Sequence, residues 1–243
     1  MSQYQNNPYQ SPAIGMNSIA AAAVQDERIR FIRNTYLHLA GAVFAFVMIE
    51  LILFNLFPGV IAKVSGLIMG TPYTWLIVLG AFMAVSYIAD RWAMSSQSIQ
   101  MQYAGLSLFV VAESVIFIPL LSMANFHAAG AIQSAGIVTL IIFGGLSAIV
   151  FVTKADFSFM RYALYLVGLA ALAAITVSIF VPGLLGVWFT WLMVVFASAY
   201  ILYHTSNIMH HYRTDQHVAA SLALFSSVAL LFWYVLQLFM SQD

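Results

Sequence analysis

The run AAGAIQSAGIVTLIIFGGLSAIVFV at residues 128–152 decides the fold class of this chain, because it contains no charged residue. A helix needs about 20 apolar residues to cross the hydrocarbon core of a bilayer. Runs of this kind predict seven spans, at residues 36–57, 73–89, 99–122, 128–152, 160–181, 187–207 and 218–239. They are continuous rather than alternating, so they predict helices and not the strands of a membrane barrel.

Composition leads to the same class. Of the 243 residues, 63% are hydrophobic and only 7% are charged, whereas soluble domains carry about 25% charged residues. We therefore expect an all-α integral membrane protein with seven transmembrane helices in one domain at residues 36–240. Residues 1–35 are predicted to form a flexible cytoplasmic tail, because the first 25 are polar and poor in large apolar side chains. Basic residues follow this polar segment, which is the wrong order for a cleavable signal peptide.

The distribution of basic residues predicts the orientation. If the N-terminus is cytoplasmic, the short cytoplasmic segments hold seven of the eight Lys and Arg residues, namely Arg28, Arg30, Arg33, Arg91, Lys154, Arg161 and Arg213. Only Lys63 then lies outside. Because cytoplasmic loops of membrane proteins are enriched in Lys and Arg, we expect the N-terminus inside and the C-terminus outside.

Three spans carry ionisable side chains well within their limits, and such residues are functional candidates by default. Glu50 lies 14 residues into the first span, and Glu113 lies 14 residues into the third, next to Ser114 and before Pro119. For Glu50 the alternatives are a carboxyl that reaches outward to the headgroups or one that is protonated by burial. A proline within a span frees a backbone carbonyl, often at a water-lined cavity, which favours a functional role for Glu113.

His204 is the third candidate, near the inner end of the sixth span, and Asn207 follows it closely. One interpretation is a pH sensor, because histidine changes charge in the physiological range. The other is a polar cap at the end of the helix.

Other chemistries have little support in the sequence. The chain has no cysteine, which excludes disulfide and thiolate chemistry. His210, His211 and His217 share a segment with Asp215, but their spacing matches no common zinc site, so we expect a solvated loop and no bound metal. We expect no resident cofactor, although calcium is a candidate for transport. Neutral net charge argues against nucleic acid as a partner, and the expected partner is the lipid bilayer.

Four segments in order resemble those of one known family. They are Arg33-Asn34-Thr35-Tyr36, the stretch Lys154-Ala155-Asp156-Phe157-Ser158-Phe159, the stretch Ile201-Leu202-Tyr203-His204-Thr205-Ser206-Asn207-Ile208, and Leu231-Phe232-Trp233-Tyr234-Val235-Leu236. Together with seven spans, they resemble the Bax inhibitor/YccA family of membrane proteins over about residues 28–240, and its bacterial YccA branch in particular. The resemblance implies a bundle in which the last helix is surrounded by the other six, and a location in the inner membrane of a bacterial cell.

The resemblance also implies function. Some members are proposed to pass calcium down its gradient in a pH-dependent way, through a pair of acids on the sixth and seventh spans. These positions fall on His204 and Ser227 here, so the two-acid latch is absent in its usual form. Glu113 resembles an acid of some other bacterial members and is the remaining candidate for a cation path. The YccA branch is linked instead to the membrane protease FtsH, as substrate and modulator.

Three functions are therefore weighed. The first is a pH-sensitive cation leak that depends on Glu113, His204 and Ser227, with Glu50, Ser114 and Asn207 as secondary polar residues. The second is a modulator or substrate of a membrane-bound AAA protease without transport activity. An intramembrane enzyme built on Ser227 and His204 ranks last, because the sequence supplies no recognisable oxyanion hole or orienting partner. We therefore expect no catalytic residues.

Overall fold

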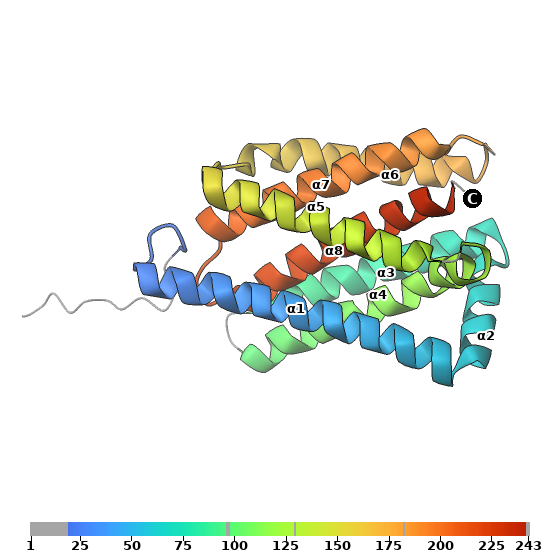
Figure 1. Ribbon diagram of the computed structural model, residues 1–243, viewed down its shortest axis with the longest axis horizontal. Helices are drawn as coiled ribbons and strands as arrows, with labels where there is room; N and C mark the ends of the chain where they lie inside the picture. Colours follow the sequence, from blue (N-terminus) through green and yellow to red (C-terminus); the bar gives the residue numbers. More distant parts are fainter. Residues whose placement is uncertain (1–18, 96–97, 129, 182, 242–243) are drawn as a thin grey trace, which may run out of the picture.

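The computed structural model describes residues 19–95, 98–128, 130–181 and 183–241. Within these ranges the chain forms helices α1 (Gln25–Leu56), α2 (Pro58–Met69), α3 (Pro72–Ala93), α4 (Ile99–His127), α5 (Ala131–Thr153), η1 (Ser158–Met160), α6 (Arg161–Ser178), α7 (Val187–His210) and α8 (His217–Met240). All but α2 and the short η1 segment are long and apolar enough to span a membrane, which confirms the seven predicted spans. The helices run roughly along one axis, and α2 lies across their end (Figure 1).

Helix α8 is at the centre of this bundle. In the most hydrophobic window of α8, 78% of the residues are buried, against 67% in α4 and at most 33% in the other five spans. Helices α1, α3, α4, α5 and α7 all pack against α8, while α6 packs mainly against α7 at the edge. The expectation of a central last helix is therefore confirmed.

The sequence of α8 explains how it accommodates so many neighbours. Its first half is rich in small residues, which let other helices approach closely; Ala219, Ala220 and Ser221 are at most 1% exposed. Its second half carries aromatic rings that fit between the surrounding helices. Phe232 stacks on Phe117 of α4 with ring centroids 5.6 Å apart, and other α8 rings contact aromatic residues of α1, α3 and α7.

The side chains on the other side of the peripheral helices are apolar and exposed. Phe44, Ile77, Ile141, Tyr165 and Val195 are each more than 60% exposed, although they are large and apolar. A soluble protein rarely exposes so much contiguous apolar surface. These faces therefore suit the hydrocarbon of the bilayer.

Several helix boundaries differ from the sequence prediction, and one helix was not predicted. Helix α1 begins at Gln25, so residues 25–35 of the predicted tail are helical; residues 1–18 lie outside the described part of the chain. Asp26 and Glu27 in the first turn favour this start, because acidic side chains complement the positive end of the helix dipole. Helix α7 continues to His210 rather than ending at residue 207. Helix α2 was not predicted, because its 12 residues are too few to span a bilayer.

Helices α3 and α4 approach each other most closely at Gly105. A Cβ atom at this position would lie 2.4 Å from the carbonyl oxygen of Ala89 and 2.6 Å from the amide nitrogen of Ala93. Both of these alanines are fully buried. Backbone atoms cannot move aside as a flexible side chain can, so the contact requires glycine.

We therefore predict that Gly105→Ala destabilises the protein, although alanine favours a helix by about 1 kcal/mol over glycine. Overpacking of a tight contact typically costs about 1–3 kcal/mol, so the melting temperature in detergent falls. The control is Gly80→Ala in α3, where an added Cβ meets no atom within 4 Å. This control retains or raises the melting temperature. Equal melting temperatures for the two variants would contradict the close packing at Gly105.

Candidate functional site

A cavity of about 440 Å³ lies beside the central helix α8, bounded also by α3, α4, α6 and α7. Glu113 of α4 and Ser227 of α8 both line it. Most of the wall is apolar, and the polar side chains on it are Ser86, Glu113, Tyr200, Ser226, Ser227 and Tyr234. A mostly apolar cavity with a few convergent polar groups is the usual form of a binding site or an ion path.

Glu113 contributes the carboxyl group of this cavity. The residue is 7% exposed, and the described part of the structure shows no ion pair that includes it. Its neighbour Ser114 is turned into the helix, where its hydroxyl donates to the carbonyl of Val110 at 3.0 Å. Pro119 lies inside the same helix, one and a half turns further on. Of these residues, Glu113 alone lines the cavity.

Ser227 is placed on the cavity wall by the regular geometry of α8. The residue is 2% exposed, and its hydroxyl donates to the carbonyl of Ala223, one turn earlier, at 2.9 Å. This leaves the lone pairs of the oxygen free to face a ligand. Among the described residues, the hydroxyl makes no hydrogen bond with His204, so the structure does not assemble the serine–histidine pair of an enzyme.

His204 lies next to this cavity rather than on its wall. Its ring packs on Tyr200 and Tyr203, with centroid distances of 5.4 and 5.1 Å, and Tyr200 in turn lines the cavity. Nδ1 of His204 is buried without a hydrogen-bond partner in the described protein. Because α7 continues for six residues beyond it, His204 is not a cap at the helix end. No ion pair joins His204 to Glu113 among the described residues.

Tyr200 was missed by the sequence analysis, although a signal for it existed. Residues four apart lie on the same face of a helix, so Tyr200 and His204 had to be neighbours. The spacing could not predict that Tyr200 also lines the cavity that contains Glu113. That contact depends on how α7 packs against α4 and α8.

A second polar cluster joins the loop after α5 to α7. Ser206 is fully buried and accepts a hydrogen bond from the backbone N–H of Phe157 at 2.8 Å, while its hydroxyl reaches the carbonyl of Ala155 at 3.3 Å. His211 Nε2 lies 3.4 Å from a carboxylate oxygen of Asp156. We call these five residues the loop clamp. Two of the segments that carried the family resemblance therefore meet in it.

The N-terminal segment closes over the same end of the bundle. Ile19 forms an isolated antiparallel bridge with Arg213, and the N–H of Ala20 donates to the carbonyl of Tyr212 at 2.9 Å. Ala20 is fully buried. Asn207 supports this turn through its backbone carbonyl, which accepts from His211 and Tyr212, and its side chain borders a separate surface pocket. Asn207 therefore serves the closed end and not the Glu113 cavity.

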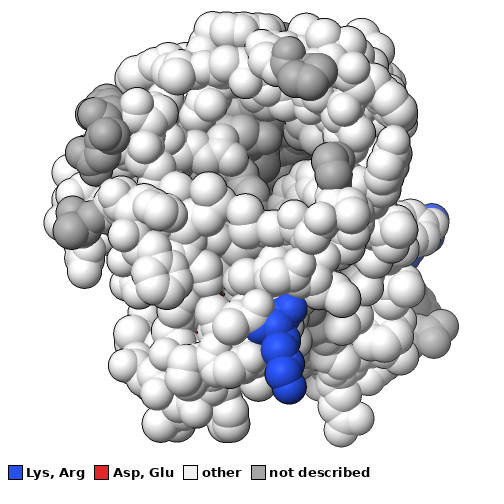
Figure 2. Space-filling view, turned by 90° about the vertical axis from the view of Figure 1, so that its right-hand side faces the viewer, with Lys and Arg blue, Asp and Glu red and all other residues white. Residues whose placement is uncertain are grey.

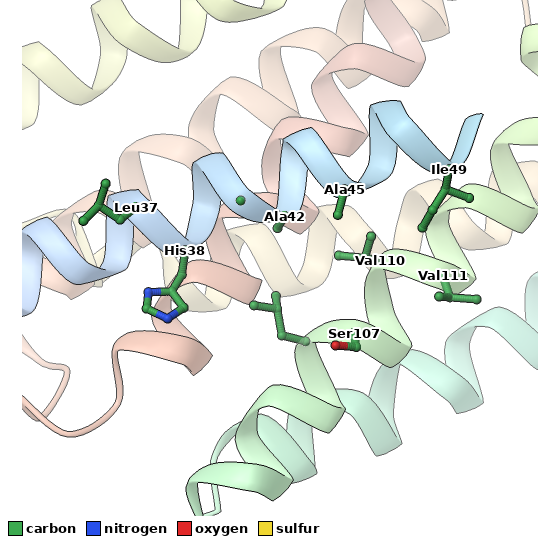
Figure 3. Close-up of a pocket in the computed structure, with 10 residues that line it drawn as sticks. Leu37, His38, Ala42, Ala45, Ile49, Ser107, Val110 and Val111 are labelled. Carbon is green, nitrogen blue, oxygen red and sulfur yellow. The ribbon is translucent and has the colours of Figure 1, made fainter. Parts of the chain in front are cut away.

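None of the remaining histidines lines the Glu113 cavity. His38 Nδ1 lies 2.7 Å from the carbonyl oxygen of Asn34, and Nε2 lies 2.7 Å from the hydroxyl of Tyr103. This ring borders a groove between α1 and α4 (Figure 3). It also packs against His217, with ring centroids 4.9 Å apart. Asp215 pairs with Arg213. No group of three potential metal ligands occurs within the described residues.

Glu50 occupies another part of the molecule. It is 7% exposed, and both carboxyl oxygens are buried within the bundle, so the side chain does not reach outward to the headgroups. It lines a cavity between α1, α4, α5 and α8 that is distinct from the Glu113 cavity.

The loop clamp has a measurable electrostatic consequence. The backbone N–H of Ser158 donates to Asp156 at 2.9 Å and, with a smaller contribution from His211, lowers the pKa of Asp156 from 3.8 to about 2. A carboxyl whose pKa is lower in the folded than in the unfolded state contributes stability above its unfolded pKa. This contribution is lost as the pH falls from about 4 to about 2.

We predict that Asp156→Asn lowers the melting temperature at pH 7, and that the difference from the wild type shrinks as the pH falls to 2. The measurement is thermal unfolding in detergent across this pH range. Asp26→Asn, which removes an exposed carboxylate on α1, serves as the control for a general charge effect and shows a smaller difference. A gap between wild type and Asp156→Asn that stays constant with pH would contradict the role of the ionised carboxylate.

Comparison with known proteins gives concordant similarities. Residues 28–243 match the family model described as "Inhibitor of apoptosis-promoting Bax1". The chain is 29% identical over 231 residues to an uncharacterized protein of Pseudomonas aeruginosa, covering 90% of this chain and 93% of that protein. It is 25% identical over 243 residues to Bax inhibitor 1 of Schizosaccharomyces pombe, covering 98% of this chain and 87% of that protein.

Proposed function

The chain belongs to the Bax inhibitor family of multi-pass membrane proteins, and we propose that it acts as a pH-sensitive cation leak in a bacterial inner membrane. The observation that carries this proposal is the buried carboxyl group of Glu113 in a cavity beside the central helix. An ionisable group at membrane depth is costly and usually marks an ion or proton pathway.

The charge distribution supports an orientation with a cytoplasmic N-terminus and an external C-terminus. The α2 end of the molecule shows little blue or red surface (Figure 2). Arg28, Arg30 and Arg33 begin α1 at the opposite end. A basic end and a nearly uncharged end match the enrichment of Lys and Arg on the cytoplasmic side.

The two ends also differ in how they are closed. The α2 end is hollowed in its surface (Figure 2), whereas the opposite end is held by the loop clamp and the Ile19–Arg213 bridge. In this proposal a cation enters from the hollowed end and reaches Glu113, and the clamped end forms the closed gate. Opening then requires movement of α7 relative to the loop that follows α5.

His204 is the proposed sensor of this gate. Among the described residues, Tyr200 and Tyr203 are the ionisable side chains that pack on its ring, and Glu113 lies beyond Tyr200. A proton bound to the imidazole adds a positive charge beside the cation path. Protonation of His204 therefore opposes cation passage, and the leak is smaller at low pH.

Calcium is the proposed cargo, with water supplying much of its coordination. The ion takes six to eight oxygen ligands, and the cavity offers one carboxyl group together with hydroxyls such as those of Ser86, Ser227 and Tyr234. One carboxylate makes a weak site, and weak binding suits conduction because the ion must also leave.

We predict that Glu113→Gln reduces calcium flux into liposomes at least about tenfold, because the neutral amide no longer compensates the charge of the ion. His204→Ala retains flux at high pH and loses the decrease at low pH. The assay is a calcium-sensitive dye inside liposomes that contain purified protein, with proton and potassium flux measured in parallel. The matched control is Glu27→Gln in the first turn of α1, and its flux is unchanged.

Two results would count against this function. An absence of calcium, proton and potassium flux in the wild type at every pH would exclude the leak. Unchanged pH dependence in His204→Ala, with flux intact, would remove the sensor role and leave the cation path.

The second candidate function is that of a modulator or substrate of a membrane-bound AAA protease. The supporting observation is the pairing of Ile19 and Ala20 with the 212–213 turn, because a protease that pulled on the N-terminus would first have to break this small contact. The segment before it, residues 1–18, lies outside the described structure. Its polar composition suits an initiation site for a protease.

If the N-terminus is such an initiation site, deletion of residues 2–18 lengthens the cellular half-life of the protein severalfold. The measurement is a chase of the epitope-tagged chain after synthesis is stopped. A scrambled segment of equal length and composition is the control, and it retains the wild-type half-life. Equal half-lives for the deleted and the full-length chain would rule out this role of the tail.

A further inference from the structure

The cavity that contains Glu50 has the features of a binding site in its own right. It has a volume of about 520 Å³ and lies between α1, α4, α5 and α8. Asn55, Asn125 and Gln133 line it near the helix ends on the α2 side of the bundle. Glu50 lies six residues before the end of α1, about 9 Å further in at 1.5 Å per residue. These exposed amides therefore lie at the α2 end of the cavity, and the carboxyl group lies further from that end.

Two polar side chains in this cavity have no partner in the described protein. Both carboxyl oxygens of Glu50 and the hydroxyl oxygen of Thr139 are buried without a hydrogen bond, and the residues are 7% and 2% exposed. Elsewhere in the bundle, buried hydroxyls such as that of Thr35 donate to the carbonyl four residues earlier. Buried polar groups are nearly always hydrogen-bonded, so two unpartnered groups in one cavity need an explanation.

No positively charged side chain of the described residues forms an ion pair with Glu50. The ion pairs found within the described ranges are His211–Asp156 and Arg213–Asp215, both outside this cavity. Thr139 offers a hydroxyl lone pair and a proton but no charge. A ligand that satisfies both groups must therefore carry a hydrogen-bond donor, and a cationic donor makes the stronger bond to a carboxylate.

The rest of the wall determines the body of that ligand. Phe46, Phe54, Leu121, Phe225 and Phe232 form an apolar lining. A bare metal ion would leave most of this apolar wall without contacts. Sites of 300–1,000 Å³ with apolar walls and a few polar groups are typical of small organic ligands.

We propose that this cavity binds a small lipophilic amine, with its ammonium group between Glu50 and Thr139 and its apolar body against the phenylalanine side chains. The aromatic faces add to the site, because a cation is attracted to the face of an aromatic ring. The amide side chains at the α2 end of the cavity interact with the polar end of a longer ligand. This site is separate from Glu113 and does not depend on the proposed leak.

The experiment measures the binding of dansylcadaverine, a fluorescent lipophilic amine, to the purified full-length chain in detergent at pH 7. Aliphatic amines are protonated at this pH. The matched neutral probe has the same dansyl group and alkyl chain without the amine. Saturable binding of the amine, at least about tenfold tighter than that of the neutral probe, is the expected result for the wild type.

The variants then locate the site. Glu50→Gln keeps the size of the side chain but removes its charge, so it weakens amine binding at least about tenfold and abolishes the preference for the amine. Thr139→Val keeps the shape and removes the hydroxyl, and it weakens binding about two- to fivefold. Glu113→Gln lies on the other cavity and binds the amine as the wild type does.

Thermal unfolding separates loss of binding from loss of folding. A ligand that binds only the folded state raises the melting temperature by mass action, so the amine stabilises the wild type and Glu113→Gln but not Glu50→Gln. Equal affinity for the amine and the neutral probe would overturn the proposal, since it would show only an apolar cavity. Unchanged amine binding in a folded Glu50→Gln variant, or no saturable binding in the wild type, would overturn it as well.

Discussion

The burial of α8 among its neighbours is the constraint on which the rest of the structure depends. A helix satisfies its own backbone hydrogen bonds, so it can lie in a dry interior. It also packs against other helices on nearly all sides. Small side chains are needed where a neighbouring helix lies close, and aromatic rings fill the space where a neighbour lies further away. The Ala219–Ser221 region and the stacked Phe232 meet these two needs. The positions of α1, α4, α5 and α7 follow from this central helix.

The same arrangement explains where the polar groups lie. Because α8 is buried, the two cavities that contain Glu113 and Glu50 lie between α8 and several outer helices. Each acid is largely buried, with 7% of its surface exposed. One bundle therefore contains two chemically different cavities, one with Ser227 and tyrosine hydroxyls and the other with Thr139 and phenylalanine rings.

The loop clamp connects the fold to the proposed gate. Ser206 is fully buried and makes two hydrogen bonds to the loop after α5. Its oxygen accepts from the N–H of Phe157, and its hydroxyl donates to the carbonyl of Ala155. His204 lies two residues earlier on the same helix, and its ring packs on Tyr200 at the edge of the Glu113 cavity. A change of charge at His204 therefore acts on a helix that is attached at one end and borders the cavity at its middle. This coupling gives the proposed pH response a physical route.

The sequence by itself determined the seven spans and the identity of the buried acids, because hydrophobic length and charge cost are local properties. The central place of α8 was implied by the family resemblance and not by these local properties. The sequence did not determine α2, whose 12 residues are too short to stand out, or the start of α1 at Gln25, where hydropathy is low. Only the tertiary structure decided that Glu113 and Ser227 share one cavity, that His204 lies beside it and that Glu50 and Thr139 face another. The reason is that helix periodicity gives the face on which a residue lies, whereas the partner of that face depends on packing between helices far apart in the chain.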